Sequence, residues 1–173
     1  MKLRQGLVFG IVFLSFVTIG IAQKGQPVHW AVTGSTHDLG MNGDIDEGSM
    51  GICAGKGTFG EHTCNTMFTG QPHPAPPAPN CYAQLAMFTH IQRFRNGDLL
   101  YSRIPSGEPL GDNYLCFNGL EYSGTVTVEF VGGTGRFEGA SGWATWVFEG
   151  EFLEENYASG INEVNGMIYL NED

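Results

Sequence analysis

The stretch VEFVGGTGRFEGASGWAT, residues 128–145, contains the strongest indication of the fold. Apolar and polar residues alternate over 121–131, the pattern of a strand with one buried face. The next four residues, 132–135, are Gly-Gly-Thr-Gly, which predicts a turn that depends on the permissive backbone of glycine. Extended structure is expected to resume over 136–152. The stretch therefore predicts two strands joined by a tight glycine turn.

A second pair of strands is predicted upstream of this stretch. Residues 81–95 form the longest strand candidate, and both of its faces are partly apolar. The pair Asn96-Gly97 follows directly, and residues 98–103 are again extended in character. Asn-Gly between two such runs is the strongest short-range hairpin signal, because both residues tolerate the positive φ of a type I′ turn.

The remainder of the chain repeats this pattern of short strands and glycine-rich turns. Residues 71–80 contain five prolines and predict a surface loop rather than a paired strand. We expect further strands at 28–33, 51–59, 62–69 and 161–170, and residues 114–117 can add one short strand to these. The count is about eight, which predicts an all-β fold, either a sandwich or a single closed antiparallel β-barrel.

The N-terminus has the features of a secretory signal peptide. Lys2 and Arg4 precede an uncharged apolar run over 7–21, and Gly20 and Ala22 supply small residues before a cleavage point. The apolar run is shorter than the roughly 20 residues of a membrane span, although an uncleaved anchor is the alternative. We therefore expect a signal peptide over 1–22, one barrel domain over 23–173, and no membrane span after cleavage.

Charge narrows the classes of partner. The 173-residue chain has a formal net charge of −10, and residues 23–173 carry six basic and 18 acidic residues, or 6 − 18 = −12. Such a protein is repelled by nucleic acids and by anionic lipids, so no nucleic-acid partner is expected. Basic partners, cations and neutral small molecules stay open, as does a solvated acidic surface with no specific role.

Four cysteines, all in the predicted mature domain, indicate two disulfides. An even number in an exported chain is typical of a disulfide framework, and four cysteines allow three connectivities. We favour Cys53–Cys64 and Cys81–Cys116, because the first two lie on neighbouring extended segments. A zinc site is the alternative, but the short ligand spacings that zinc sites use are missing, so no metal is expected.

The glycine stretch resembles the signature of the allene oxide cyclase and dirigent barrel superfamily. The residues that carry the resemblance are Gly132, Gly133, Thr134, Gly135, Phe137, Gly139, Ala140 and Gly142, preceded by the hairpin RNGDLLY at 95–101. The resemblance implies an eight-stranded barrel, often trimeric in plant members, in which Phe137 and Ala140 pack inward. It also implies a protein that works without a metal or an organic cofactor, and the signal peptide implies an extracellular protein, or a periplasmic one in a bacterium.

The resemblance leads to three functional hypotheses. The first is binding of a small apolar or phenolic molecule in the barrel lumen without covalent chemistry. The second is a cofactor-free isomerase or cyclase similar to allene oxide cyclases, so that catalysis stays open; no family active-site residue aligns with a position here. The third is a structural or interaction domain of the cell surface or matrix. Candidate lumen residues, chosen as aromatic or ionisable strand residues, are Tyr82, His90, Tyr101, Glu121, Glu129 and Trp146.

Two further features are weaker candidates. Asn42, Asp44 and Asp46 have the spacing that opens a calcium loop, but Glu47 and Cys53 occupy positions where an EF-hand needs Gly and Glu. An irregular calcium site or a solvated loop are the remaining interpretations. Arg136, beside the glycine turn, is expected to tie that loop to a carboxylate.

Overall fold

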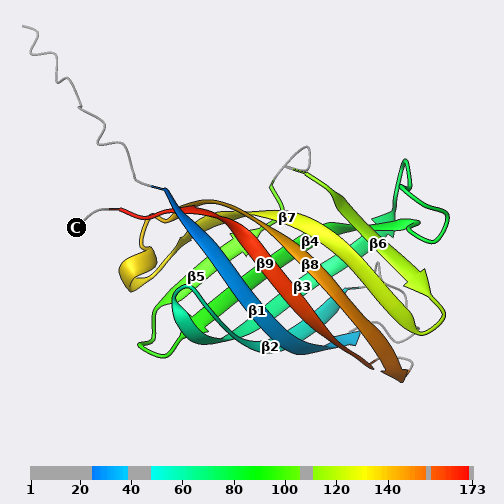
Figure 1. Cartoon of the computed structure of the whole chain (residues 1–173), viewed down its shortest axis with the longest axis horizontal. Coiled ribbons are helices and arrows are strands. Elements are labelled where there is room, and N and C mark those ends of the chain that lie inside the picture. Colours follow the sequence, from blue (N-terminus) through cyan, green and yellow to red (C-terminus); the bar gives the residue numbers. More distant parts are fainter. Residues whose placement is uncertain (1–24, 39–47, 106–110, 155–156, 172–173) are drawn as a thin grey trace, which may run out of the picture.

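The computed structural model describes residues 25–38, 48–105, 111–154 and 157–171, and these residues form an all-β protein (Figure 1). The predicted signal peptide and the acidic segment 42–47 lie outside the described residues. No helix in the described part is long and apolar enough to cross a membrane. The strands are β1 (Gly25–Asp38), β2 (Ser49–Gly57), β3 (Gly60–Pro72), β4 (Ala83–Phe94), β5 (Leu99–Arg103), β6 (Asn113–Asn118), β7 (Glu121–Gly133), β8 (Ser141–Glu154) and β9 (Tyr157–Tyr169).

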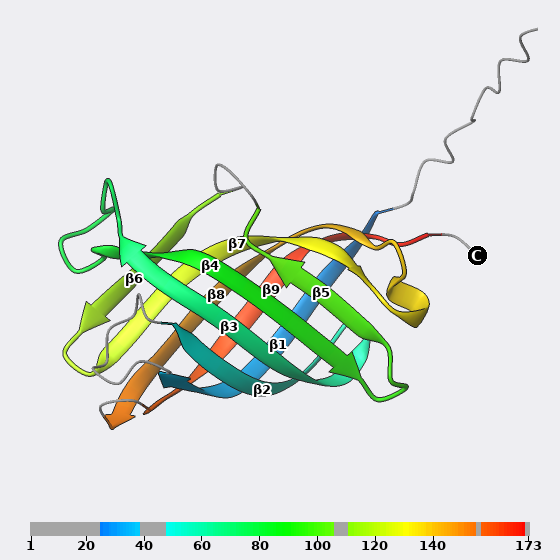
Figure 2. The same ribbon diagram turned by 180° about the vertical axis from the view of Figure 1, so that it is seen from behind.

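The strands close into one antiparallel barrel, as the sequence predicts. The sheet runs β3-β2-β1-β9-β8-β7-β5-β4, and pairing of β3 with β4 closes it. The extra strand β6 pairs with β7 and touches β4 at one residue pair. β5 pairs with the later parts of β4 and β7, whereas β6 pairs with their beginnings. β5 and β6 thus occupy the same one of the eight strand positions, the one between β4 and β7, and they lie at opposite ends of the barrel (Figures 1 and 2).

The predicted Asn-Gly hairpin connects β4 and β5. Gly97 has a φ of +91°, and the Phe94 N–H donates to the Asp98 carbonyl over 2.9 Å. β3 and β4 are joined through the proline-rich segment, which carries no strand beyond Pro72. Both connections therefore lie where the sequence predicts them, but the hairpin turn is not type I′, because Asn96 lacks the positive φ that a type I′ turn requires.

A β-bulge in β4 explains why both faces of the strand predicted over 81–95 are partly apolar. Leu85 pairs with Gly70 and Met87 pairs with Thr69, so Ala86 is an extra residue. The inward face shifts by one residue at this point, and Leu85 and Phe88 are both buried although they differ in parity. Two partly apolar faces in the sequence therefore reflect a change of face along one strand.

The glycine stretch ends one strand but does not lead directly into the next. The turn between the two strands places the Phe137 side chain in the end of the barrel. β7 ends at Gly133, a 3-10 turn follows at Gly135–Phe137, and β8 begins only at Ser141. The expectation of extended structure from residue 136 was therefore wrong by five residues. Phe137 and Ala140 are buried, as the superfamily resemblance implies. The turn folds Phe137 back into the barrel mouth, because an extended chain would carry that side chain past it.

This end of the barrel, called the closed end, is filled by aromatic rings. Phe137 is fully buried and lies 5.1 Å from Phe59 and 4.9 Å from Phe94, measured between ring centroids. The Arg136 guanidinium lies 4.8 to 5.3 Å from the same three ring centroids. It also pairs with Asp98 at 3.4 Å, which confirms the expected tie to a carboxylate. Rings and cation together close this mouth.

Candidate functional site

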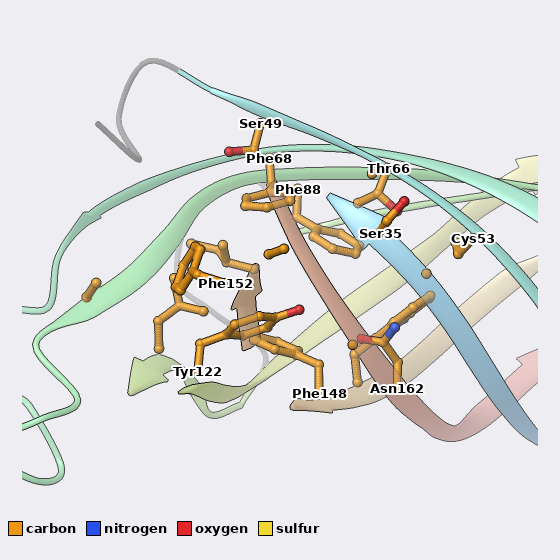
Figure 3. A pocket seen from close by; sticks show the side chains of 18 of the residues that line it. Ser35, Ser49, Cys53, Thr66, Phe68, Phe88, Tyr122, Phe148, Phe152 and Asn162 are labelled. Atoms are coloured by element: carbon orange, nitrogen blue, oxygen red, sulfur yellow. The ribbon is translucent and has the colours of Figure 1, made fainter. Parts of the chain in front are cut away.

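The opposite half of the barrel is hollow. A cavity of about 390 Å³, called here the luminal cavity, is lined by residues of all strands except β5 (Figure 3). It lies within the range of about 300–1,000 Å³ typical of small-molecule sites. Its aromatic lining side chains are Phe68, Tyr82, Phe88, Phe117, Tyr122, Trp146, Phe148, Phe152 and Tyr157.

The cavity exists because one row of its wall has almost no side chains. Cys53 pairs with Gly34, Gly34 with Gly160, and Gly160 with Gly150, so four neighbouring strands present three glycines and a cysteine side by side. Gly150 in turn pairs with Tyr122. At the closed end, by contrast, large rings fill the interior. Small residues along one inner row and aromatic rings around it therefore leave an empty, apolar space.

Tyr122 and Asn162 are two of the polar side chains that line this space. Tyr122 and Asn162 both extend into the pocket, on the side that faces Phe68 and Phe88 (Figure 3). Burial raises the pKa of Tyr122 above its ordinary value of 10.0, so the phenol is neutral at physiological pH. No Asp, Glu, Lys, Arg or His is among the described residues that line the cavity. The site is suited to an uncharged molecule.

A buried histidine lies beneath the cavity. His90 is 1% exposed, and its Nδ1 lies 2.8 Å from the Thr66 hydroxyl, which belongs to the cavity wall. Its ring meets Trp146 edge to face at a centroid distance of 4.5 Å. Burial, with a smaller effect of nearby His62, lowers the pKa of His90 to about 3. His90 is therefore a neutral imidazole that helps to fix the floor.

Both disulfides have the predicted pairing. Cys53–Cys64 joins directly opposed residues of β2 and β3 on the inner face, and Cys53 contributes to the cavity wall. Cys81–Cys116 joins the residue just before β4 to β6. Cys53, Cys64 and His90 also form the one cluster of potential metal ligands in the described ranges. Both sulfurs are consumed in the disulfide, and a metal would need thiolates.

The structure brings together some of the candidate lumen residues. Trp146 lies in the wall and His90 below it. Tyr82 is at the rim, 56% exposed, and its ring stacks on Phe117 at 5.3 Å. Glu121 is exposed and lines a neighbouring pocket, which shares Tyr122 and Gly160 with the luminal cavity, rather than the cavity itself. The positions of Trp146, His90 and Tyr82 are therefore compatible with a site at this end of the barrel.

Two candidates lie on the outer surface, which corrects their assignment to the lumen. Tyr101 lies between Leu100 and Ser102, both of which are buried at about 0–2% exposure. Glu129 has the outward parity of its strand and pairs with Arg103 at 2.8 Å. A strand's side chains alternate, so each of these residues faces away from its buried neighbours. Their polar character matches the solvent side.

The sequence analysis missed the residues that define the cavity. Tyr122 shares its parity with the buried Val126 and Phe130, and this pattern could have placed it inside the barrel. Phe148 and Asn162 pair with each other across β8 and β9. Their position in the cavity depends on strand register, which a single sequence leaves undetermined.

The comparisons with known proteins add a likeness in fold. No family model and no curated protein matches the chain. Among solved structures, it resembles the pterocarpan synthase dirigent protein GePTS1, with 14% identity, a TM-score of 0.47 and 87% coverage of each chain. It also resembles the pterocarpan synthase dirigent protein PsPTS1, with 12% identity and a TM-score of 0.49, over 87% of this chain and 97% of that one. At such identities the similarity concerns the barrel fold alone.

Proposed function

We propose that this chain is an exported β-barrel protein that binds a small apolar or phenolic molecule in its lumen and carries out no covalent chemistry. The observation that carries the proposal is the luminal cavity, whose wall is mainly aromatic and holds few polar groups. Largely preformed apolar cavities with a few placed polar groups are the usual form of a small-molecule site. A barrel interior filled by side chains would have offered no such space.

Export is supported by two independent features. The first 22 residues have the order of a secretory signal peptide, with a positive start, an apolar run and small residues. The described part of the chain has two disulfides and no free cysteine. Such bonds persist in oxidising compartments. The domain proposed to be exported is residues 23–173.

Binding is favoured over catalysis by the ionisable groups at the cavity. The described lining offers three tyrosines and no carboxylate or histidine. A general base works best when its pKa lies near the working pH, and burial moves the pKa of Tyr122 further from neutrality. The neutral, low-pKa His90 is buried below the cavity and is not among the residues that line it. The cavity is thus better suited to holding a molecule than to abstracting a proton.

The test is a titration of the purified, oxidised protein with naphthol, followed by calorimetry and by quenching of tryptophan fluorescence. We expect saturable one-to-one binding. Ala158→Phe places a ring in the cavity from β9 and should abolish binding, whereas Ala31→Phe, at an exposed position of β1, should leave it unchanged. Failure of the natural protein to bind, or equal binding by the Ala158→Phe variant, would overturn the proposal.

A second candidate, an interaction domain, is favoured by one feature of the outer wall. Five large apolar side chains on β2, β3 and β4 are 41–54% exposed: Met50, Ile52, Met67, Met87 and Ile91. Met50 and Met67 are directly paired, so the group spans adjoining strands. Exposed apolar patches mark association surfaces when they are large and continuous. Sedimentation of the natural protein and of Met67→Lys tests this, because self-association through the patch should be lost in the variant.

A further inference from the structure

Tyr122 owes its position to two glycines on neighbouring strands. Tyr122 on β7, Gly150 on β8 and Gly160 on β9 lie side by side on the inner face. A Cβ atom at Gly150 or at Gly160 would lie 2.5 Å from the Tyr122 Oη. Only the absence of both Cβ atoms lets the phenol lie across the two strands. The hydroxyl is thereby carried from β7 as far as β9.

Asn162 lies beside the point that this hydroxyl reaches. It is two residues beyond Gly160 on the same strand and the same face, a separation of about 7 Å along the strand. Both side chains are directed into the pocket in Figure 3. The phenol and the amide therefore flank one small region of a cavity whose wall is mainly apolar.

These two groups have hydrogen-bonding capacity left for a ligand. Among the described residues, the Tyr122 hydroxyl and the Asn162 side-chain amide have no hydrogen-bond partner, whereas the Thr66 hydroxyl is engaged with His90. The Tyr122 hydroxyl keeps its proton because burial raises its pKa, so it can donate. The Asn162 amide can donate or accept.

The rest of the cavity limits the ligand's charge and size. An ionised group would enter an apolar space without a counter-charge, which is costly. The volume of about 390 Å³ is near the lower end of ligand pockets, so a compact ring system fits better than a long chain. The chain's net charge of −10 also disfavours anions.

We propose that the luminal ligand is a compact, uncharged ring compound with one oxygen function, a carbonyl or a hydroxyl, which accepts a hydrogen bond from Tyr122 beside the Asn162 amide. This inference rests on the proposed function and specifies its ligand class. Tyr122 and Asn162 are then the residues that discriminate an oxygen-bearing ring from a plain hydrocarbon.

Calorimetry with three matched probes tests the inference: methyl naphthyl ketone, naphthalene and naphthoate. The natural protein should bind the ketone more tightly than naphthalene, and naphthoate at least about 10-fold more weakly than the ketone, because its charge would be buried unpaired. Tyr122→Phe should weaken ketone binding by about 5- to 10-fold, the value of one hydrogen bond, and leave naphthalene within about twofold. Asn162→Ala should also weaken the ketone selectively.

The matched control is Tyr101→Phe, the same substitution on the outer surface, which should leave all three affinities unchanged. Thermal unfolding of each variant establishes that it is folded. If the natural protein binds neither the ketone nor naphthalene, the proposed function itself fails. If it binds both, but Tyr122→Phe leaves their affinity ratio unaltered, or naphthoate binds as tightly as the ketone, the inference fails while luminal binding stands.

Discussion

Stability should fall as the pH is lowered through the range in which an unfolded chain protonates its histidines, and His90 should account for much of this loss. His90 is buried with a pKa of about 3, whereas histidine in an unfolded chain has a pKa of 6.5. A group whose pKa is lowered by folding contributes stability above its unfolded pKa and loses it as the pH falls toward the folded value.

The magnitude follows from linkage. Between about pH 7.5 and about pH 5 the native His90 stays neutral while the unfolded chain takes up a proton, which lowers the free energy of unfolding by about 2 kcal/mol. Burial also lowers the pKa of His62, so this residue adds to the loss in the same direction. This pH range ends above the pH values at which carboxyl groups titrate.

Urea unfolding at both pH values, for the natural protein and for His90→Gln, measures this effect. Glutamine keeps an amide near Thr66 but does not titrate, so the variant's pH-dependent loss should be smaller by about 2 kcal/mol. His29→Gln, at an exposed position, should retain the full dependence. In the natural protein, the His90 ring resonances should show no titration down to about pH 4. Identical pH dependence for the natural protein and the His90→Gln variant would refute the reasoning.

Three further predictions concern the disulfides and the outer wall. Replacing Cys81 and Cys116 with alanine should lower the free energy of unfolding by about 4 kcal/mol, and replacing Cys53 and Cys64 should lower it by about 3 kcal/mol. The first loss is larger because that bond closes a loop of 35 residues rather than 11 and so restricts the unfolded chain more. Urea unfolding measures both losses, and equal losses or the reverse order would contradict the estimate. Reduction of the natural protein should lower its melting temperature without unfolding it at room temperature, because a domain of this size buries an adequate core. Glu129→Gln should leave naphthol binding unchanged and alter the free energy of unfolding by less than about 1 kcal/mol, since the ion pair with Arg103 is exposed to solvent. Weakened naphthol binding would instead indicate that the Glu129 side chain faces the lumen.

The sequence predicts the architecture better than the site because the two depend on different information. Alternation, Asn-Gly and the glycine stretch are local signals, and they correctly predict an antiparallel barrel and the Gly97 hairpin. The closure of β3 on β4 and the division of one position between β5 and β6 are long-range facts that no local pattern encodes.

The site depends on register and on one irregularity. The bulge at Ala86 reverses the face of β4, so parity counted from Cys81 misplaces the inner residues after the bulge, such as Phe88 and His90. The cavity itself arises where Gly34, Gly150 and Gly160 align across three strands. A pairing register shifted by one residue would turn these positions outward, and sequence alone does not fix it. Tyr101 and Glu129 were misplaced because residue type was given more weight than the parity of their buried neighbours.

The most direct test of the central claim, a preformed luminal site, is the crystal structure of the protein purified from its native source with no ligand added. The account predicts continuous density that is not protein in the cavity between Phe88 and Tyr122, or an open cavity of the same shape that binds naphthol on soaking. A collapsed interior, in which Phe68, Phe148 and Phe152 close over the glycine row and naphthol does not enter, would contradict it.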